Sequence, residues 1–82
     1  MKIIEIVDTD YYANSNFHVV LFDGVDIKEE YKVWKTLPYE QQRIPAEGGV
    51  GYNYDFGTWL VHHNKARWPD DSEFDTFEES YN

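Results

Sequence analysis

Two short runs of β-branched and aromatic residues lie in the first quarter of the chain. Residues 2–7 (Lys-Ile-Ile-Glu-Ile-Val) are followed by the turn-forming residues 8–10, and residues 17–22 (Phe-His-Val-Val-Leu-Phe) by Asp23-Gly24. Both runs therefore predict strands. The first run is apolar on both faces, so its strand is expected near the centre of a sheet.

The spacing of apolar residues becomes helical after Asp26. Ile27, Tyr31 and Trp34 recur three or four residues apart with charged side chains between them. The Asp26 carboxylate can accept the hydrogen bonds of an N-cap. This pattern predicts an amphipathic helix near residues 26–37 that ends before the next proline.

The segment from residue 38 to residue 54 has no clear period. Pro45 and three glycines indicate a loop, with room for one strand near residues 50–54. Tyr52 and Tyr54 are two positions apart. They are either exposed on one face, where tyrosine favours protein contacts, or paired across a sheet.

Residues 58–63 (Thr-Trp-Leu-Val-His-His) support two interpretations. Their composition indicates a strand, residues 64–65 a turn and residues 66–68 a returning strand, so the preferred prediction is a hairpin. The alternative is a helix with one largely apolar face. That face would consist of Phe56, Trp59, Leu60 and His63.

A second helical period follows Pro69. Phe74, Phe77 and Tyr81 occupy positions i, i+3 and i+7, which predicts a short C-terminal helix near residues 71–80. The elements together predict an α+β fold: a small antiparallel or mixed sheet of three to four strands with two short helices. The predicted core consists of Ile4, Ile6, Val19, Leu21, Trp34, Trp59, Val61 and Phe77.

The length and composition of the chain limit how stable this fold can be. The chain has 82 residues, of which 41% are hydrophobic and 18% aromatic, and this suits a single folded domain spanning residues 1–82. A core of this size supplies little stability, and there is no cysteine to crosslink it. Trp34, Trp59 and Trp68 are therefore all expected in the interior.

The chain carries no pattern of a membrane or secreted protein. Its longest apolar runs are far shorter than the ~20 residues of a membrane helix. Glu5 interrupts the N-terminal apolar stretch at once, unlike a signal peptide. With no cysteine, these features predict a soluble, cytoplasmic protein without membrane contacts.

The net charge is −9, from 16 acidic and 7 basic residues. Such a charge repels phosphate, so direct binding to nucleic acid is not expected and a basic protein is the expected partner. The charge is uneven: residues 1–26 sum to −4, residues 28–67 to +1 and residues 70–82 to −6.

The acidic C-terminal segment is the strongest candidate for a binding site. In a helix, Asp71, Asp75, Glu78 and Glu79 would form one stripe, with ~5.4 Å between turns, and could imitate backbone phosphates. The alternative is a solvated helix face whose acids favour the helix dipole. The candidate partner-binding residues are Asp70, Asp71, Glu73, Asp75, Glu78, Glu79, Tyr52 and Tyr54.

Catalytic and metal-binding chemistry has little support. His62 and His63 would point to opposite faces of a strand and could not chelate one metal together. The glycine-rich residues 48–51 lack the Lys-Ser or Lys-Thr of a phosphate-binding loop, and no serine has an evident base. No enzymatic activity, metal or cofactor is expected.

The C-terminal third contains several short motifs in a distinctive order. Residues 57–61 (Gly-Thr-Trp-Leu-Val), Trp68-Pro69-Asp70 and a Phe-containing segment ahead of Ser80-Tyr81 follow one another. With the early run Ile4-Glu5-Ile6-Val7, this order resembles a group of small phage proteins of unknown function. The group commonly has a glycine in the turn where this chain has Asn64-Lys65. The resemblance covers about a third of the chain plus that run, and it implies a phage origin and a hairpin followed by a helix, but no activity.

Charge, stripe and resemblance lead to one functional hypothesis. The chain is expected to be a phage-encoded acidic protein that occupies a basic site on a host nucleic-acid-handling or defence protein, of the CRISPR or restriction type, as a DNA mimic. The alternative is an accessory or structural phage protein that assembles into homo-oligomers through its aromatic faces.

Overall fold

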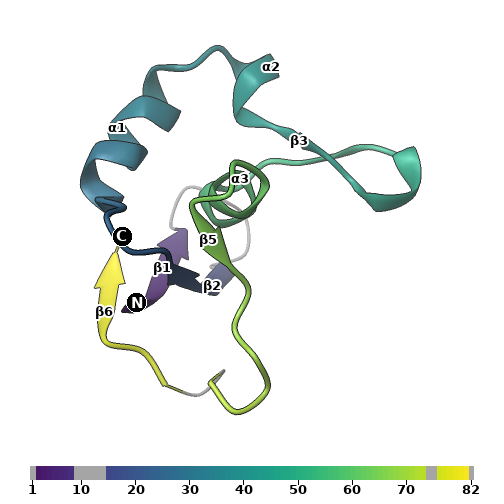
Figure 1. Ribbon diagram of the computed structural model, residues 1–82. Helices are drawn as coiled ribbons and strands as arrows, with labels where there is room; N and C mark the ends of the chain where they lie inside the picture. Colours follow the sequence, from purple (N-terminus) through teal and green to yellow (C-terminus); the bar gives the residue numbers. More distant parts are fainter. Residues whose placement is uncertain (1, 9–14, 74–75, 82) are drawn as a thin grey trace.

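A four-stranded mixed sheet forms one side of the protein (Figure 1). The computed structural model describes residues 2–8, 15–73 and 76–81. Strands β1 (Lys2–Asp8) and β2 (Ser15–Leu21) pair antiparallel, and the order across the sheet is β5-β2-β1-β6. Strand β5 is Ala66–Arg67, and β6 is Glu79–Tyr81, which pairs parallel to β1. The α+β prediction is confirmed, as are the two N-terminal strands and the inner position of the first.

Among the described residues, three α-helices, one 3₁₀ helix and a small second sheet complete the structure (Figure 1). Helix α1 (Ile27–Thr36) begins as predicted, because the Asp26 carboxylate accepts hydrogen bonds from the backbone N–H groups of Lys28 and Glu29. The remaining elements follow in chain order. They are α2 (Tyr39–Gln42), β3 (Ile44–Pro45), the 3₁₀ helix η1 (Glu47–Gly49), β4 (Tyr52–Asn53) and α3 (Phe56–His62).

The hydrophobic core lies between one face of the β1–β2 pair and helices α1 and α3. Alternate strand residues supply one side of it, and aromatic side chains from the helices supply the other. Ile4, Ile6, Val19, Leu21, Trp34 and Trp59 are buried as predicted. Val61 is only partly buried and packs against the edge of this core.

The predicted hairpin at residues 58–63 is wrong, and the helical alternative is correct. Asp55 caps α3: its carboxylate accepts from the Thr58 N–H at 2.6 Å and from the Thr58 hydroxyl at 2.8 Å. The helix then buries Phe56, Trp59 and Leu60 together, which alternate positions of a strand could not do. Of the predicted returning strand, only β5 forms.

The predicted helix at residues 71–80 is also wrong. Residues 71–73 form a turn, and β6 continues the main sheet along the second edge of β1. The Glu78 N–H donates to the Ile3 carbonyl at 2.8 Å, so this backbone bonds to the sheet and not to itself. Phe74 and Asp75, which the prediction placed in the helix, lie outside the described residues.

Two aromatic residues that were expected in the interior are half exposed. Trp68 is 44% exposed and Phe77 48% exposed. Phe77 packs on the His18 ring, with centroids 5.6 Å apart. His18 is on the face of β2 opposite the core residues Val19 and Leu21, so Phe77 cannot reach the core.

Candidate functional site

The segment between β5 and β6, residues 68–78, is called the acidic loop below (Figure 1). A bidentate ion pair closes its first turn. Arg67 Nη1 lies 2.9 Å from Glu73 Oε1, and Arg67 Nη2 lies 3.1 Å from Glu73 Oε2. The same carboxylate accepts from the Asp70 N–H at 2.8 Å, and the Glu73 N–H donates to the Asp70 carbonyl at 2.9 Å. The loop therefore has a defined start as well as a defined end at β6.

Two of the predicted partner-binding acids already form ion pairs with basic residues of the same chain. The hydrogen bond from Arg67, followed by the one from the Asp70 backbone, lowers the pKa of Glu73 to about 2. The same bond raises the pKa of Arg67, so both groups are charged and neutralise each other. Lys2 Nζ lies 3.1 Å from Glu79 Oε2 and partly neutralises that carboxylate.

Three further predicted acids, Asp70, Asp71 and Glu78, are exposed, but they do not form a stripe. Asp70 and Asp71 lie at the first turn of the acidic loop, and Glu78 lies at its far end before β6. None of these three carboxylates has a side-chain ion pair within the described ranges. Their spacing is set by a turn and a strand junction, so the regular repeat of a helix face is absent here.

The two predicted tyrosines have different roles. Tyr52 in β4 is 55% exposed, and the Arg43 guanidinium lies over its ring at 4.0 Å from the centroid. Tyr54 is partly buried: its hydroxyl donates to Gln42 Oε1 at 3.1 Å, and its ring packs 5.4 Å from that of Trp34. Only Tyr52 is available to a partner, and Figure 1 shows its hairpin well apart from the acidic loop.

A row of polar side chains crosses three strands next to the acidic loop. The Ser80 hydroxyl donates to Glu5 Oε1 at 3.2 Å, and His18 Nε2 lies 3.7 Å from Glu5 Oε2. The carboxylate is in the middle of the row, so the hydroxyl bonds to the carboxylate and not to the imidazole. A serine nucleophile requires the opposite order, with the base next to the hydroxyl. The row links β6, β1 and β2.

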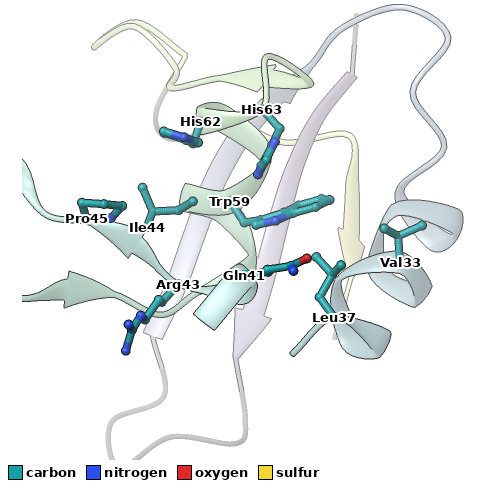
Figure 2. Close-up of a pocket in the computed structure, with 9 residues that line it drawn as sticks. All are labelled: Val33, Leu37, Gln41, Arg43, Ile44, Pro45, Trp59, His62 and His63. Atoms are coloured by element: carbon teal, nitrogen blue, oxygen red, sulfur yellow. The ribbon is translucent and has the colours of Figure 1, made fainter. Parts of the chain in front are cut away.

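A hollow of about 420 Å³ lies between α1, α2, β3 and α3 (Figure 2). It is called the α1–α3 pocket below. Trp59 and His62 line it from α3 and His63 from the C-cap of that helix, and Figure 2 shows the Trp59 indole between the His63 ring and Gln41. This pocket was not predicted from the sequence, because residues 58–63 were expected to form a strand. The helical spacing of Trp59 and His63 was the signal that could have indicated it.

The pocket's histidines do not form a metal site. Their rings lie 5.2 Å apart, and no three His, Asp or Glu side chains in the described ranges come together as metal ligands. Burial lowers the pKa of His63, and the nearby positive charges of His62 and Lys65 lower it further against the opposing effect of Glu30. His63 is therefore mostly neutral at pH 7.

Comparisons with known proteins give no family. No protein-family model, curated protein or solved structure matches this chain. Among the helices of the described ranges, none has the length and apolar character needed to cross a membrane.

Proposed function

We propose that this protein binds a basic, nucleic-acid-binding site on another protein and blocks it through the acidic loop. The observation that carries the proposal is the set of exposed carboxylates of Asp70, Asp71 and Glu78 on a segment fastened at both ends. In the sequence, residues 70–82 hold six acids and no base. A partner's lysines and arginines can therefore form ion pairs with these carboxylates without breaking many ion pairs within the chain.

Charge and aromatic contact have separate roles in this proposal. A net charge of −9 attracts a basic surface over long distances and speeds encounter, and this effect weakens as salt rises. The exposed rings of Trp68 and Phe77 sit at the two ends of the acidic loop. Aromatic side chains of this kind carry much of the binding energy of interfaces and slow release.

Fastening the loop supports tight binding. The Arg67–Glu73 ion pair holds the turn at residues 70–73, and the pairing of β6 with β1 holds residues 79–81, before a partner arrives. A segment that is ordered in advance loses less conformational entropy on binding. The carboxylates of the acidic loop are not spaced like the regular, phosphate-like stripe of a helix. Their negative charge, more than their spacing, therefore supports the proposed imitation of nucleic acid.

The resemblance to small phage proteins supports a partner in the cytoplasm of a bacterial host. Nucleases of CRISPR or restriction systems have basic nucleic-acid sites whose blockage benefits a phage. They are the class of partner that we propose.

The test is capture from host lysate with the tagged protein, washed at low and high salt and identified by mass spectrometry. The double variant Asp70→Lys/Asp71→Lys should lose the captured protein. Glu40→Lys/Glu47→Lys is the matched control, because each pair changes the net charge from −9 to −5 and both control side chains are exposed outside the acidic loop. Equal loss with both variants, or capture that is insensitive to salt, would contradict the proposal.

A second candidate function is self-assembly through the β3–β4 side of the molecule. Tyr39 and Tyr52 lie on the same Arg43 guanidinium, and Val50 nearby is 85% exposed. Tyrosine and arginine clusters of this kind are enriched in interfaces. Sedimentation velocity at increasing concentration should then show defined oligomers that Tyr52→Ser abolishes, whereas a monomer at every concentration would rule this candidate out.

A further inference from the structure

Val50 is an apolar side chain at the tip of the β3–β4 hairpin. It is 85% exposed, more than any other large hydrophobic side chain of the described residues. The hairpin closes behind it, where the Ala46 N–H donates to the Gly51 carbonyl at 3.1 Å. Figure 1 shows this tip standing away from the main sheet and from α1. The fold of one chain therefore leaves Val50 in water, and burial against a partner would be favourable.

Glycines make the tip narrow. Gly48, Gly49 and Gly51 have φ values of 86°, 76° and 78°, which favour glycine over any residue with a side chain. At all three positions the space that a Cβ would occupy has no other atom within 4 Å. Val50 is therefore flanked by bare backbone, and its side chain can enter a hollow that a broader loop could not.

The α1–α3 pocket is a hollow of suitable character for this side chain. Figure 2 shows Val33 and Leu37 of α1 on one side of it and Ile44 of β3 on the other. Val33 is 47% exposed, so part of this apolar wall faces solvent in the single chain. The pocket volume of about 420 Å³ leaves room for a valine side chain together with the backbone that carries it.

The charges around the tip and the pocket are complementary. Residues 46–51 of the tip carry one charged side chain, the exposed carboxylate of Glu47. No aspartate or glutamate lines the pocket, and its exposed imidazole of His62 can carry a positive charge. Residues 28–67 also sum to +1, so two chains of net charge −9 repel each other least on this side.

We propose that two copies of this chain form a twofold dimer in which Val50 of each copy enters the α1–α3 pocket of the other. This inference rests on the second candidate function, self-assembly, and names the contact that makes it. Ile44 and Pro45 of β3 line the pocket, and the same strand leads into the tip. Tip and pocket therefore belong to one side of the molecule, and a twofold axis can exchange both tips at once.

The first test is sedimentation at increasing concentration with two variants of Val50. The unaltered protein should change from monomer to dimer. Val50→Ser should raise the dissociation constant of the dimer about a hundredfold, because each of its two contacts loses about tenfold. Val50→Leu keeps an apolar side chain and is the matched control, so its dimer should persist. Since Val50 is 85% exposed, neither change should alter the fold of the monomer.

The second test identifies the pocket as the acceptor of the tip. Val33→Gln places a polar side chain on the exposed part of the pocket wall and leaves the tip intact, whereas Val50→Ser leaves the pocket intact. Each variant alone should dimerise weakly. An equal mixture should dimerise more tightly than either variant, because the tip of one and the pocket of the other form one complete contact.

Salt separates this dimer from binding through the acidic loop. The contact is mainly apolar and the two chains carry like net charge, so added salt should strengthen the dimer by screening their repulsion. Capture of a basic partner should weaken under the same change. The variant Asp70→Lys/Asp71→Lys should lose the captured partner and still dimerise.

Three results would overturn the proposed contact. They are a dimer that Val50→Ser leaves unchanged, a mixture of Val50→Ser and Val33→Gln that associates no more tightly than the separate variants, and growth of the unaltered protein into species larger than dimers. In each case self-assembly itself stands and the contact is wrong. A monomer at every concentration contradicts both the contact and the second candidate function.

Discussion

The Arg67 guanidinium and the Glu73 carboxylate form a two-point ion pair across the turn that follows β5, with N–O distances of 2.9 and 3.1 Å. This pair removes one cation and one carboxylate from the surface available to a partner. It also sets where the neighbouring carboxylates of Asp70 and Asp71 are presented. We therefore expect this ion pair to contribute to the free energy of unfolding as well as to partner binding.

The stability contribution of Glu73 should depend on pH. Its pKa is lowered from 4.5 to about 2 in the folded chain, so the folded state binds fewer protons than the unfolded state between those values. The contribution is complete above about pH 4.5 and is lost as pH falls toward 2. Urea unfolding should therefore show Glu73→Gln destabilised at pH 7, with a smaller difference from the unaltered protein near about pH 3. Glu40→Gln is the control, and a difference that does not depend on pH would contradict this role.

Gly57 lies in the first turn of α3 at a position that can accept a side chain. A Cβ there would meet the Phe17 Cβ at 3.5 Å and Asp55 Oδ1 at 3.4 Å, which are ordinary contacts, and its φ is not positive. Because alanine loses less backbone entropy than glycine in a helix, Gly57→Ala should raise the free energy of unfolding by about 0.4–1 kcal/mol. Chemical denaturation measures this gain. A loss of stability would contradict the helical conformation of the segment.

Gln42 is a buried polar residue whose side chain makes two hydrogen bonds and whose carbonyl accepts from a buried indole. Its amide donates to the Trp34 carbonyl at 2.7 Å, its side-chain oxygen accepts from the Tyr54 hydroxyl at 3.1 Å, and its own carbonyl accepts from Trp34 Nε1. Gln42→Ala removes the two side-chain bonds. The Tyr54 hydroxyl then loses its acceptor, whereas the Trp34 carbonyl keeps the Leu37 N–H, and the change should cost about 1–3 kcal/mol. The exposed neighbour Gln41 is the matched control, and Gln41→Ala should change the free energy of unfolding by less than about 0.5 kcal/mol.

His63 should destabilise the folded chain in acid. Its pKa is lowered from 6.5 by burial and by the charges of His62 and Lys65, against the opposing charge of Glu30. The folded state therefore binds fewer protons, and stability decreases as pH falls through 6.5. An NMR titration should place the His63 midpoint below 6.5, and His63→Gln should lose less stability in acid than His62→Gln. A His63 midpoint above 6.5 would contradict the prediction.

Local sequence patterns were sufficient for the first half of the fold. The β-branched runs at β1 and β2 and the capped amphipathic helix α1 carry their own signals, namely composition, period and an N-cap at Asp26. The core residues on those elements followed from the same periods. The net charge and the acidic C-terminal segment are likewise properties of the sequence alone.

The C-terminal third was ambiguous because each segment there satisfied two local patterns. Residues 58–63 have the composition of a strand and the spacing of a helix, and the Asp55 cap with joint burial of Trp59 and Leu60 favours the helix. Phe74, Phe77 and Tyr81 have helical spacing, but the open edge of β1 offers hydrogen bonds to the backbone of residues 78–81.

The candidate sites depended on the same tertiary choices. The acids of residues 70–79 were evident from the sequence, but which of them remain unpaired was decided when Arg67 and Lys2 reached Glu73 and Glu79. The α1–α3 pocket combines residues from four elements, so no local pattern describes it. Sequence determined which local structures were available. The burial of apolar surface, together with the pairing of β5 and β6 along the two edges of the β1–β2 pair, selected among them.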